Sequence, residues 1–538
     1  MRAESILPLG WCCTSLEKIA SWGSGGTPSR NVARYFQGSI PWIKTGELEN
    51  KFIREAEEHI TEEALNNSSA KIFPKGSVGI AMYGATIGKL SIWGIDASTN
   101  QACAVGIPSK VINNEFLYYF LLAERQNLIK AGKGGAQPNL SQGVIKEWPI
   151  SLPPLPEQHR IVAKIEELFS ELDKGIENLK TARAQLKVYR QALLKHAFEG
   201  KLTAQWRAEN QDKLETADAL LKRIQQERAQ RYQQQFADWE NSKSPSAPSQ
   251  ALPLLQRGKT ISAATSSSPP LKKGGRGDLK PKAPKSLPPL TAEELAELPE
   301  LPEEWGWVRL DEVSEKITDG DHQAPPQTTE GIPFITISDI KNQRIDFSDT
   351  RYVSKSYFDG LSEMRKPVKD DILYTVTGSF GIPCLIDFER DFCFQRHIGL
   401  IRSCKSISNK FLFYVLSSRH VYGQAASVAT GTAQKTVPLG GLRMFKIPLT
   451  SLEEQQQIAS ELEARLSEAD QLELTITTSL QQAEALRQSI LKKAFSGQLV
   501  PQDPHDEPAS KLLARIKAEK MLHTHESKKP ISRSKRNE

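Results

Sequence analysis

The sequence lacks the features that would place the protein in a membrane or in an oxidising compartment. It has no run of about 18 apolar residues, and its first residues, MRAESILPLGW, contain no apolar stretch of a signal peptide. The six cysteines form no CxxC pair and have no ligand-like spacing with histidine, so they indicate no zinc site. We therefore expect a cytoplasmic protein with reduced thiols and no membrane contact.

Common catalytic and nucleotide-binding motifs are also missing. The chain has no GxGxxG after a strand, no HExxH, no GxSxG, and no Asn/Asp-Pro-Pro-aromatic tetrapeptide of the kind that amino-methyltransferases use. In GATIGKLS, from Gly84, three residues separate the glycines and Leu90 follows the lysine, which does not match a phosphate loop. His322, in DGDHQAPP, suits a turn better than catalysis. The sequence predicts a protein with no catalytic residue, metal or cofactor of its own.

Length and composition are those of a multidomain globular protein. The 538 residues are 38% hydrophobic and 25% charged, enough for roughly three or four domains of about 150 residues. The formal net charge of +6 permits a polyanionic partner without requiring one.

An internal duplication covers most of the chain. The segment from Tyr189, YRQALLKHAFEGKLTAQ, recurs without a gap from Leu486 as LRQSILKKAFSGQLVPQ. Further pairs lie at a nearly constant offset: IPWIKTGELEN with IPFITISDIKN, NEFLYYFL with NKFLFYVL, LPEQHRI with LEEQQQI, and LLKRIQQE with LLARIKAE. Repeats of this kind indicate two copies of one architecture.

Six regions follow from this repeat. We predict globular domains at 1–154 and 301–451, helical regions at 155–240 and 452–520, a flexible Pro/Ser/Lys-rich linker at 241–300 and a basic tail at 521–538. The basic cluster of the linker is either a solvated charge run or a contact with DNA, and the composition favours the first.

Each helical region begins with a long amphipathic helix. The first follows Pro154 and the second follows Leu452, and Gly200 and Gly497 end them at equivalent positions. Their apolar residues recur in steps of three and four, close to a heptad, over about 60 Å of helix. An antiparallel coiled coil of the two helices accounts for these stripes; separate core helices of two domains are the alternative. The stripes comprise Ile161, Ile165, Leu168, Leu172, Ile176, Leu179, Leu186, Tyr189 and Leu193, and Ile458, Leu462, Leu466, Ala469, Ile476, Leu480, Ala483, Leu486 and Ile490.

The globular domains carry strand signals and are predicted to be α+β. The runs SVGIAMYG, KLSIWGI and ACAVGI have counterparts in DILYTVTG, PCLIDF and HIGLIRS, each close to glycine-rich turns.

Polar loops in both domains contain side chains suited to reading DNA. The first domain has KAGKGGAQPNLSQG and the second ATGTAQKTVPLGG, whose Gln, Asn and Lys side chains are able to contact base edges or phosphates. A surface loop in which the glycines only make turns is an equal alternative. The predicted DNA-binding residues are Arg30, Arg34, Lys44, Lys133, Gln137, Asn139, Lys341, Arg344, Gln434 and Lys435.

The alternation of block and helix, with GGTPSR, TDGDHQAPP, GAQPNLS, LPPLPEQHRIV, EEQQQIA and LLKHAFEGKL, resembles the specificity subunit of a type I restriction-modification enzyme. The resemblance covers about residues 1 to 235 and 300 to 520. It implies two target recognition domains that each read half of a bipartite, asymmetric site in double-stranded DNA. It also implies helices that dock two modification subunits, with restriction subunits completing the enzyme. S-adenosylmethionine, ATP and Mg²⁺ would belong to those partners.

The apolar helix ends are predicted docking positions for partner subunits. Leu194 and Phe198 precede Gly200, and Leu491 and Phe495 precede Gly497. In an antiparallel pair each end would pack beside the globular domain at the start of the other helix. The alternative from another class is a coiled-coil scaffold that joins two protein-binding domains and does not contact DNA.

Overall fold

The computed structural model describes residues 7–109, 112–132, 139–243, 283, 287–321 and 325–526 of the 538. The chain forms two compact units, of which the first is made of two separate stretches. The first unit consists of Met1–Ala182 with Leu474–Glu538, and the second is Arg183–Glu473. Each unit therefore holds one α+β domain, the start of one long helix and the end of the other. The predicted α+β class and internal repeat are confirmed.

The domain of the first unit contains a five-stranded sheet in the order β2-β9-β6-β7-β4, a three-stranded sheet β5-β3-β8 and a two-stranded sheet β1-β10. The bounds are β1 Cys12–Ser15, β2 Ala20–Ser24, β3 Ile40–Ile43, β4 Phe52–Ile53, β5 Glu58–Ile60, β6 Val78–Ala81, β7 Leu90–Trp93, β8 Ser98–Thr99, β9 Cys103–Pro108, β10 Pro149–Leu152, α1 Leu16–Ile19, α2 Glu62–Asn66, α3 Asn114–Ala131 and α4 Gln142–Glu147.

The domain of the second unit repeats this plan with a four-stranded sheet β12-β20-β17-β18, a three-stranded sheet β16-β13-β19, and the pairs β11-β21 and β14-β15. The bounds are β11 Gly306–Arg309, β12 Ser314–Asp319, β13 Ile332–Ile335, β14 Ile340–Lys341, β15 Arg344–Ile345, β16 Arg351–Val353, β17 Ile372–Thr375, β18 Pro383–Leu385, β19 Cys393–Phe394, β20 Ile398–Ser403, β21 Lys446–Leu449, α8 Ala292–Ala296, α9 Lys355–Gly360, α10 Asn409–Leu416, α11 Arg419–Val428 and α12 Leu439–Arg443. The six strand runs predicted from sequence contain β6, β7, β17, β18 and β20 and all of β9 except Pro108.

Two equivalent glycines let strands of neighbouring sheets cross closely. A Cβ added to Gly25, just after β2, would overlap the carbonyl oxygen of Thr99. A Cβ added to Gly320, just after β12, would overlap the carbonyl oxygen of Phe394. Only glycine permits such an approach of two backbones, which explains why GGTPSR and TDGDHQ each place a glycine directly after the strand.

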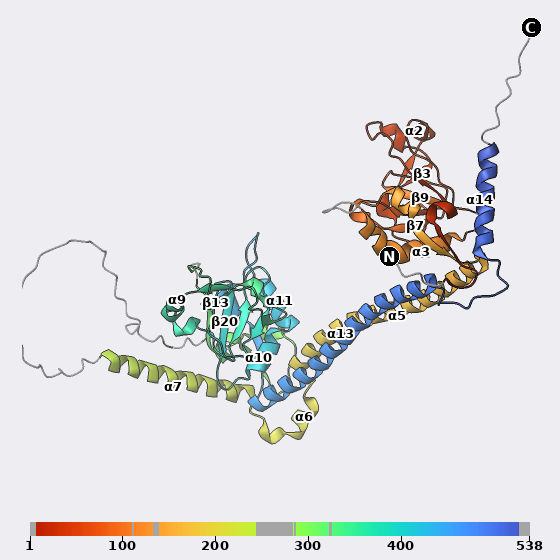
Figure 1. Cartoon of the computed structure of the whole chain (residues 1–538). Helices are drawn as coiled ribbons and strands as arrows, with labels where there is room; N and C mark the ends of the chain where they lie inside the picture. Colours follow the sequence, from red (N-terminus) through yellow and green to blue (C-terminus); the bar gives the residue numbers. More distant parts are fainter. Residues whose placement is uncertain are drawn as a thin grey trace, which may run out of the picture. The chain divides into compact units, whose positions relative to one another are not determined.

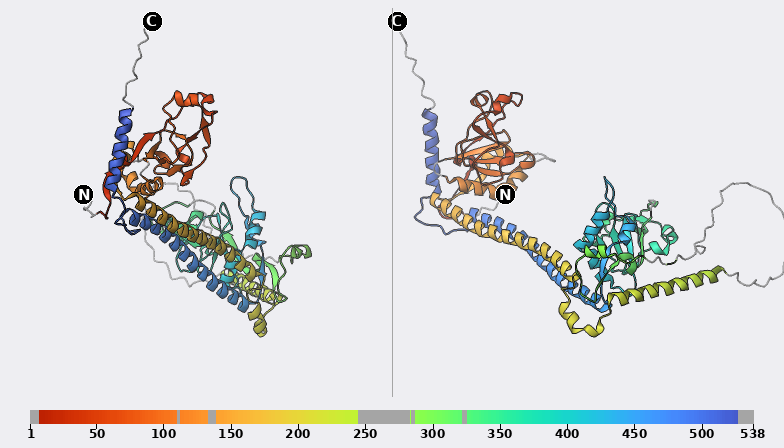
Figure 2. Two further views of the ribbon diagram at one scale, coloured as in Figure 1. Left: turned by 90° about the vertical axis from the view of Figure 1, so that its right-hand side faces the viewer. Right: turned by 180° about the vertical axis from the view of Figure 1, so that it is seen from behind.

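The two long helices, α5 Leu155–Phe198 and α13 Leu452–Phe495, lie side by side in each unit (Figure 1 and Figure 2). In the first unit Arg487 of α13 pairs with Asp173 of α5. In the second unit Arg190 of α5 pairs with Asp470 of α13 at 2.7 Å. Both pairings join an early residue of one helix to a late residue of the other, so the predicted antiparallel coiled coil is confirmed.

The predicted apolar stripe was wrong at one position in each helix. Tyr189 is 43% exposed and the equivalent Leu486 is 51% exposed. Their neighbours Arg190 and Arg487 are partly buried instead, because each guanidinium reaches an acidic side chain of the facing helix. At this position of each helix an arginine ion pair, not an apolar contact, joins the two helices.

Three further helices follow the long ones: α6 Ala204–Glu209, α7 Ala217–Lys243 and α14 Ala509–Glu526. The amide of Ala217, at the start of α7, donates to the carbonyl of Glu304 at 2.9 Å. The amide of Ala509, at the start of α14, donates to the carbonyl of Gly10 at 2.8 Å. The starts of α7 and α14 are therefore each attached to the segment that leads into the domain of the same unit.

Candidate functional site

Two of the predicted DNA-binding cations in the first domain are already paired with carboxylates. Arg30 lies 2.6 Å from Glu58 and stacks over the ring of Phe36 at 4.1 Å. Lys44 lies 2.7 Å from Glu57 and 3.3 Å from the same Glu58. Hydrogen bonds from Arg30 and Lys44 lower the pKa of Glu58, so this carboxylate is charged at neutral pH. The cluster has little unneutralised positive charge to offer a phosphate.

Arg34 is neutralised in the same way. Its guanidinium makes a bidentate contact with Glu63 of α2, with distances of 2.8 to 3.3 Å. Both side chains are largely exposed, and the hydrogen bond to Glu63 raises the pKa of Arg34. Exposed pairs of this kind contribute little to stability and are easily exchanged for another anion.

Lys341 and Arg344 flank a two-residue turn between β14 and β15. The turn residues Asn342 and Gln343 have φ of 50° and 62°, as a type I′ hairpin turn requires. Lys341 pairs with Asp346 at 2.8 Å, and that hydrogen bond keeps the pKa of Asp346 below its usual range. No ion pair of Arg344 is seen among the described residues.

In the second domain, three segments meet beyond the end of β17. The amide of Val376 donates to the carbonyl of His397 at 2.9 Å, and the amide of Val437 donates to the carbonyl of Val376 at 2.7 Å. The amide of Gly378 donates to the carbonyl of Lys435 at 3.0 Å. Gln434 and Lys435 are both exposed on this loop. We call this junction, residues 376–381, 395–397 and 430–437, the loop edge of the second domain.

The first domain has an equivalent edge at residues 82–88, 100–102 and 139–140. Met82 donates to the carbonyl of Ala102 and accepts from the amide of Leu140, both at 2.8 Å. Asn139 is exposed at the base of the loop. Lys133 and Gln137, predicted for the same loop, lie outside the described residues.

The second edge carries cations that are not neutralised. Within the described part of the chain, no ion pair joins Lys435 or Arg396 to a carboxylate. Arg396 lies 3.4 Å from the ring nitrogen of His397, and burial with the neighbouring Arg396 lowers the pKa of His397. His397 is therefore neutral at pH 7, and the positive charge of the edge comes from Arg396 and Lys435.

Sequence reasoning missed Arg396. It also missed two helix residues, Arg125 and Tyr422, which lie under the turn between β6 and β7 and the turn between β17 and β18, respectively. Gly88 and Gly381 have φ of 75° and 88°, and an added Cβ would lie 3.1 Å from Arg125 and 2.8 Å from Tyr422, respectively. The matching glycines of the two copies were a usable signal, but the differing helix residues hid the equivalence.

The first domain is fastened to α5 by a charged cluster. Lys51 contacts Glu115 of α3 and Glu166 of α5, and its Nζ lies 3.3 Å from the hydroxyl of Tyr119. Burial lowers the pKa of Lys51, but the two carboxylates outweigh burial and raise it overall. The second domain has a direct pair instead, Lys410 with Glu463 at 2.7 Å.

Equivalent buried glutamates join each domain to the start of its long helix. Trp11 donates to Glu157 at 3.0 Å, and Trp305 donates to Glu454 at 2.8 Å. Glu454 also accepts from Thr203 and Arg207, which follow the end of α5. We call these two sites the helix joints.

The predicted docking residues belong to the helix joints. Leu491 is buried, and Phe495 packs against Phe116 and Phe120 with ring centroids 5.3 and 5.4 Å apart. Phe198 is buried against Phe411 at 5.8 Å. These side chains hold the ends of the helices to the domains, as the antiparallel prediction expected.

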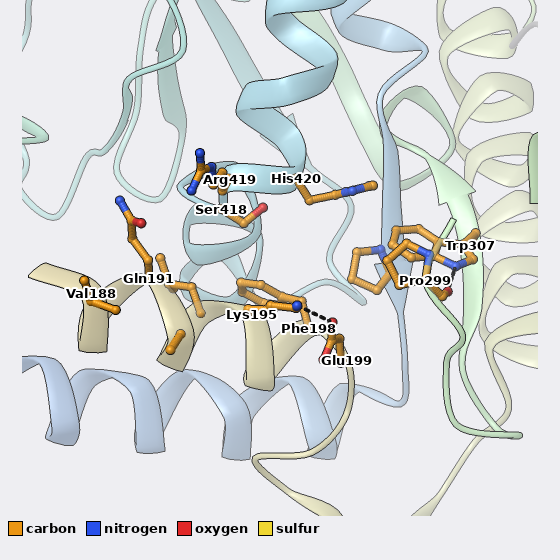
Figure 3. Close-up of a pocket in the computed structure, with 13 residues that line it drawn as sticks. Val188, Gln191, Lys195, Phe198, Glu199, Pro299, Trp307, Ser418, Arg419 and His420 are labelled. Carbon is orange, nitrogen blue, oxygen red and sulfur yellow. Dashed lines mark hydrogen bonds and ion pairs between the residues drawn. The ribbon is translucent and has the colours of Figure 1, made fainter. Parts of the chain in front are cut away.

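An apolar cavity of about 440 Å³ lies beside the second joint (Figure 3). Leu194 and Phe198 line it from α5, and Trp307 from β11. The ring of Trp307 lies 5.1 Å from that of His420, whose pKa is lowered by burial. In the first unit, the β1-β10 register places the exposed Cys13 at the position of Trp307. The two joints therefore differ in the side chain at this strand position, which is Cys13 in β1 and Trp307 in β11.

Within the described residues, no group of three His, Cys, Asp or Glu side chains is arranged to hold a metal ion. No described helix is both long and apolar enough to cross a membrane.

Comparison with known proteins identifies the repeated block. A family model described as "Type I restriction modification DNA specificity domain" matches the chain twice, at residues 8–181 and 302–482. The two matches together take up more than half of the chain.

Individual relatives are specificity subunits of type I restriction enzymes, and they align with most or part of this chain. The EcoDI specificity subunit of Escherichia coli is 21% identical over 536 residues, 96% of this chain and 96% of that protein. The E. coli EcoBI specificity subunit is 24% identical over 432 residues, 78% of this chain and 74% of that protein. The E. coli EcoR124I/EcoR124II specificity subunit is 28% identical over 189 residues, 33% of this chain, which spans only 47% of that relative.

A solved structure shares the fold. A chain described under "Structural basis underlying complex assembly and conformational transition of the type I R-M system" aligns with a TM-score of 0.62 at 18% identity. The alignment covers 92% of this chain and 100% of the other.

Proposed function

The chain belongs to the family of type I restriction-modification DNA specificity proteins, and we propose that it reads a bipartite, asymmetric site in double-stranded DNA for such an enzyme. The observation that carries this proposal is the loop edge, which has the same backbone hydrogen bonds in both domains but different side chains. One backbone framework with two sets of side chains suits two different half-sites. We assign the two target recognition domains to residues 1–154 and 301–451.

The partner subunits follow from the helix joints. Because Glu157 and Glu454 make equivalent hydrogen bonds, the two joints have the same core and suit two copies of one modification subunit. Restriction subunits would complete the assembly. S-adenosylmethionine, ATP and Mg²⁺ would be held by the partners, and this chain would act without a catalytic residue of its own in the cytoplasm.

Methylome sequencing of the host tests this function. Single-molecule sequencing is expected to show a methylated motif of two defined halves separated by a fixed gap. Deleting the gene should remove this motif, and restoring the gene should bring it back. A methylome that is unchanged by the deletion would refute the proposal.

A scaffold without DNA contact would behave differently in a binding assay. DNA affinity that comes from phosphate contacts falls steeply with salt, whereas a scaffold would show weak and salt-insensitive binding. The assay uses the chain assembled with its modification subunits, because the complete complex is the proposed DNA-binding form.

A further inference from the structure

The loop edges of the two domains have turns with one shared backbone design. The amide of Gly88 donates to the carbonyl of Ala81 at 2.8 Å, and the amide of Gly381 donates to the carbonyl of Thr375 at 2.9 Å. Both glycines have positive φ; a Cβ added to Gly88 would meet Ile129 and Arg125 of α3, and one added to Gly381 would meet Tyr422 of α11. These positions are therefore structural equivalents, whatever their side chains.

The helix residue under each turn differs in chemistry. In the first domain the turn lies over Ile129 and Arg125 of α3, and the Nε of Arg125 is buried and has no hydrogen-bond partner among the described residues. In the second domain the turn lies over Tyr422 of α11, which is 50% exposed. Phe380 of the turn stacks on Tyr422 with ring planes 9° apart and centroids 5.7 Å apart. A guanidinium at one edge thus corresponds to an aromatic pair at the other.

The surroundings of the aromatic pair favour nucleic acid as its ligand. The turn that holds Phe380 is bonded through Gly378 to the loop of Gln434 and Lys435, and Lys435 has no acidic partner among the described residues. A half-exposed aromatic beside an unneutralised cation matches the two parts of a nucleotide, a base and a phosphate. A purely apolar partner would leave that cation without a counter-charge.

This inference rests on the proposed function. We propose that Arg125 and the Phe380–Tyr422 pair are the residues that make the two half-sites different. Arg125 donates to the O6 and N7 acceptors of a guanine in the half-site of the first domain, as arginine does in major grooves. Tyr422, held flat by Phe380, presents its ring to a thymine methyl group in the half-site of the second domain.

Methylation by the assembled modification complex tests this assignment. Substrates carry each single base-pair change across both half-sites, and the ratio of rates on cognate and changed DNA measures discrimination. Arg125→Ala is expected to lower discrimination about 10- to 100-fold at one G·C pair of the first half-site and to leave the second unchanged. Tyr422→Ala is expected to lower it about 5- to 10-fold at one T·A pair of the second half-site only.

Matched variants separate a reading role from a folding role. Arg54→Ala, which removes an exposed arginine of the same domain, and Tyr189→Ala, which removes an exposed tyrosine of α5, should leave discrimination at both half-sites unchanged. Should Arg125→Ala not assemble, Arg125→Gln keeps a polar side chain of similar reach and should still lose the guanine preference. Tyr422→Phe keeps the ring and should retain the wild-type preference.

The outcomes also distinguish this inference from the function it rests on. If wild type reads a bipartite motif and both alanine variants keep its discrimination within twofold, the assignment is wrong and the proposed function stands. If the variants lose assembly with modification subunits but the residual complex discriminates as wild type does, the edge binds protein, and the assignment is again overturned. If wild type shows no bipartite preference, the proposed function fails first.

Discussion

The indole of Trp305 donates a 2.8 Å hydrogen bond to the fully buried carboxylate of Glu454. This contact ties the first residues of the second domain to the first turn of α13. Thr450 also donates to Glu454, at 2.7 Å. Because Thr203 and Arg207 donate to the other oxygen, one carboxylate holds together the domain, the start of one long helix and the end of the other.

Removing the Glu454 carboxylate should weaken the second unit severely. Glu454→Ala leaves Arg207, Trp305 and two threonines without their acceptor, which costs about 3 to 5 kcal/mol for a broken buried pair. Thermal denaturation followed by circular dichroism should show a clearly lower midpoint. Glu468→Ala, an exposed change on the same helix, is the control and should leave the midpoint unchanged. Equal midpoints for the two variants would contradict the role of Glu454.

The glycines that end the long helices should not tolerate alanine. Gly200 and Gly497 have φ of 70° and 74°, and an added Cβ would overlap Pro302 and Pro8, respectively. Gly200→Ala and Gly497→Ala should each destabilise the protein by about 1 kcal/mol or more, because alanine is strained at positive φ. Gly175, inside α5 with no atom near its added Cβ, is the matched control. Gly175→Ala should stabilise by about 0.5 to 1 kcal/mol, and loss of stability there would refute this account.

The same two joints show what could be predicted from the sequence. The repeated helix ends and the glycine stops were visible because the two copies keep the same residues at one spacing. The role of the glutamates in the joints was not visible, because their tryptophan partners are far away along the chain and no periodicity links them. The stripe prediction failed at Tyr189 because the competing ion pair of Arg190 involves the other helix.

The candidate site was predictable only where the copies agree. The loops of Asn139 and Gln434 stood out as polar insertions in matching places, whereas Arg125 and Tyr422 share no chemistry and gave no signal. The pairing of Arg30, Arg34 and Lys44 with glutamates also required three-dimensional contacts. Sequence shows which cations exist, and the fold decides which of them remain free.

Lys316 should make stability depend on pH. Burial, with Arg402, Arg365 and Arg443 nearby, lowers the pKa of Lys316 from 10.5 to about 8. The unfolded chain then binds more protons than the folded one between pH 8 and 10.5, so stability rises with pH across this window. Lys316→Met should raise the thermal midpoint at pH 7, and its advantage over wild type should vanish toward pH 10.5.

The exposed Lys355 provides the control for this titration. Its side chain is 71% exposed and pairs only with Asp359 of its own helix. Lys355→Met should therefore show no pH-dependent change in midpoint against wild type. A Lys316→Met advantage that stays constant from pH 7 to 10.5 would mean that packing, not charge, explains it.

The Lys51 cluster should couple the first domain to its spacer helix more strongly than Lys410 couples the second. A double-mutant cycle with Lys51→Met and Glu166→Gln is expected to give a coupling energy of about 1 kcal/mol, because Lys51 is only 21% exposed. The cycle with Lys410→Met and Glu463→Gln should give less than about 0.5 kcal/mol, since both side chains are more than half exposed. Equal coupling in the two units would contradict this difference.

Lengthening both spacer helices should change the gap of the DNA site without changing its halves. Seven residues inserted in α5 and seven at the equivalent place in α13 keep the heptad phase and add about 10 Å of helix. That length corresponds to about three base pairs at 3.4 Å each. The half-sites should be unaffected, because their contacts lie in the domains, far along the chain from either insertion.

An insertion that lengthens only one of the two helices is the control for the double-insertion experiment. Seven residues in α5 only would put Arg190 out of register with Asp470, so assembly with modification subunits should be lost. Methylome sequencing of cells carrying each variant reads the gap directly. A double insertion that assembles and methylates the original gap would show that the coiled coil does not measure the spacing.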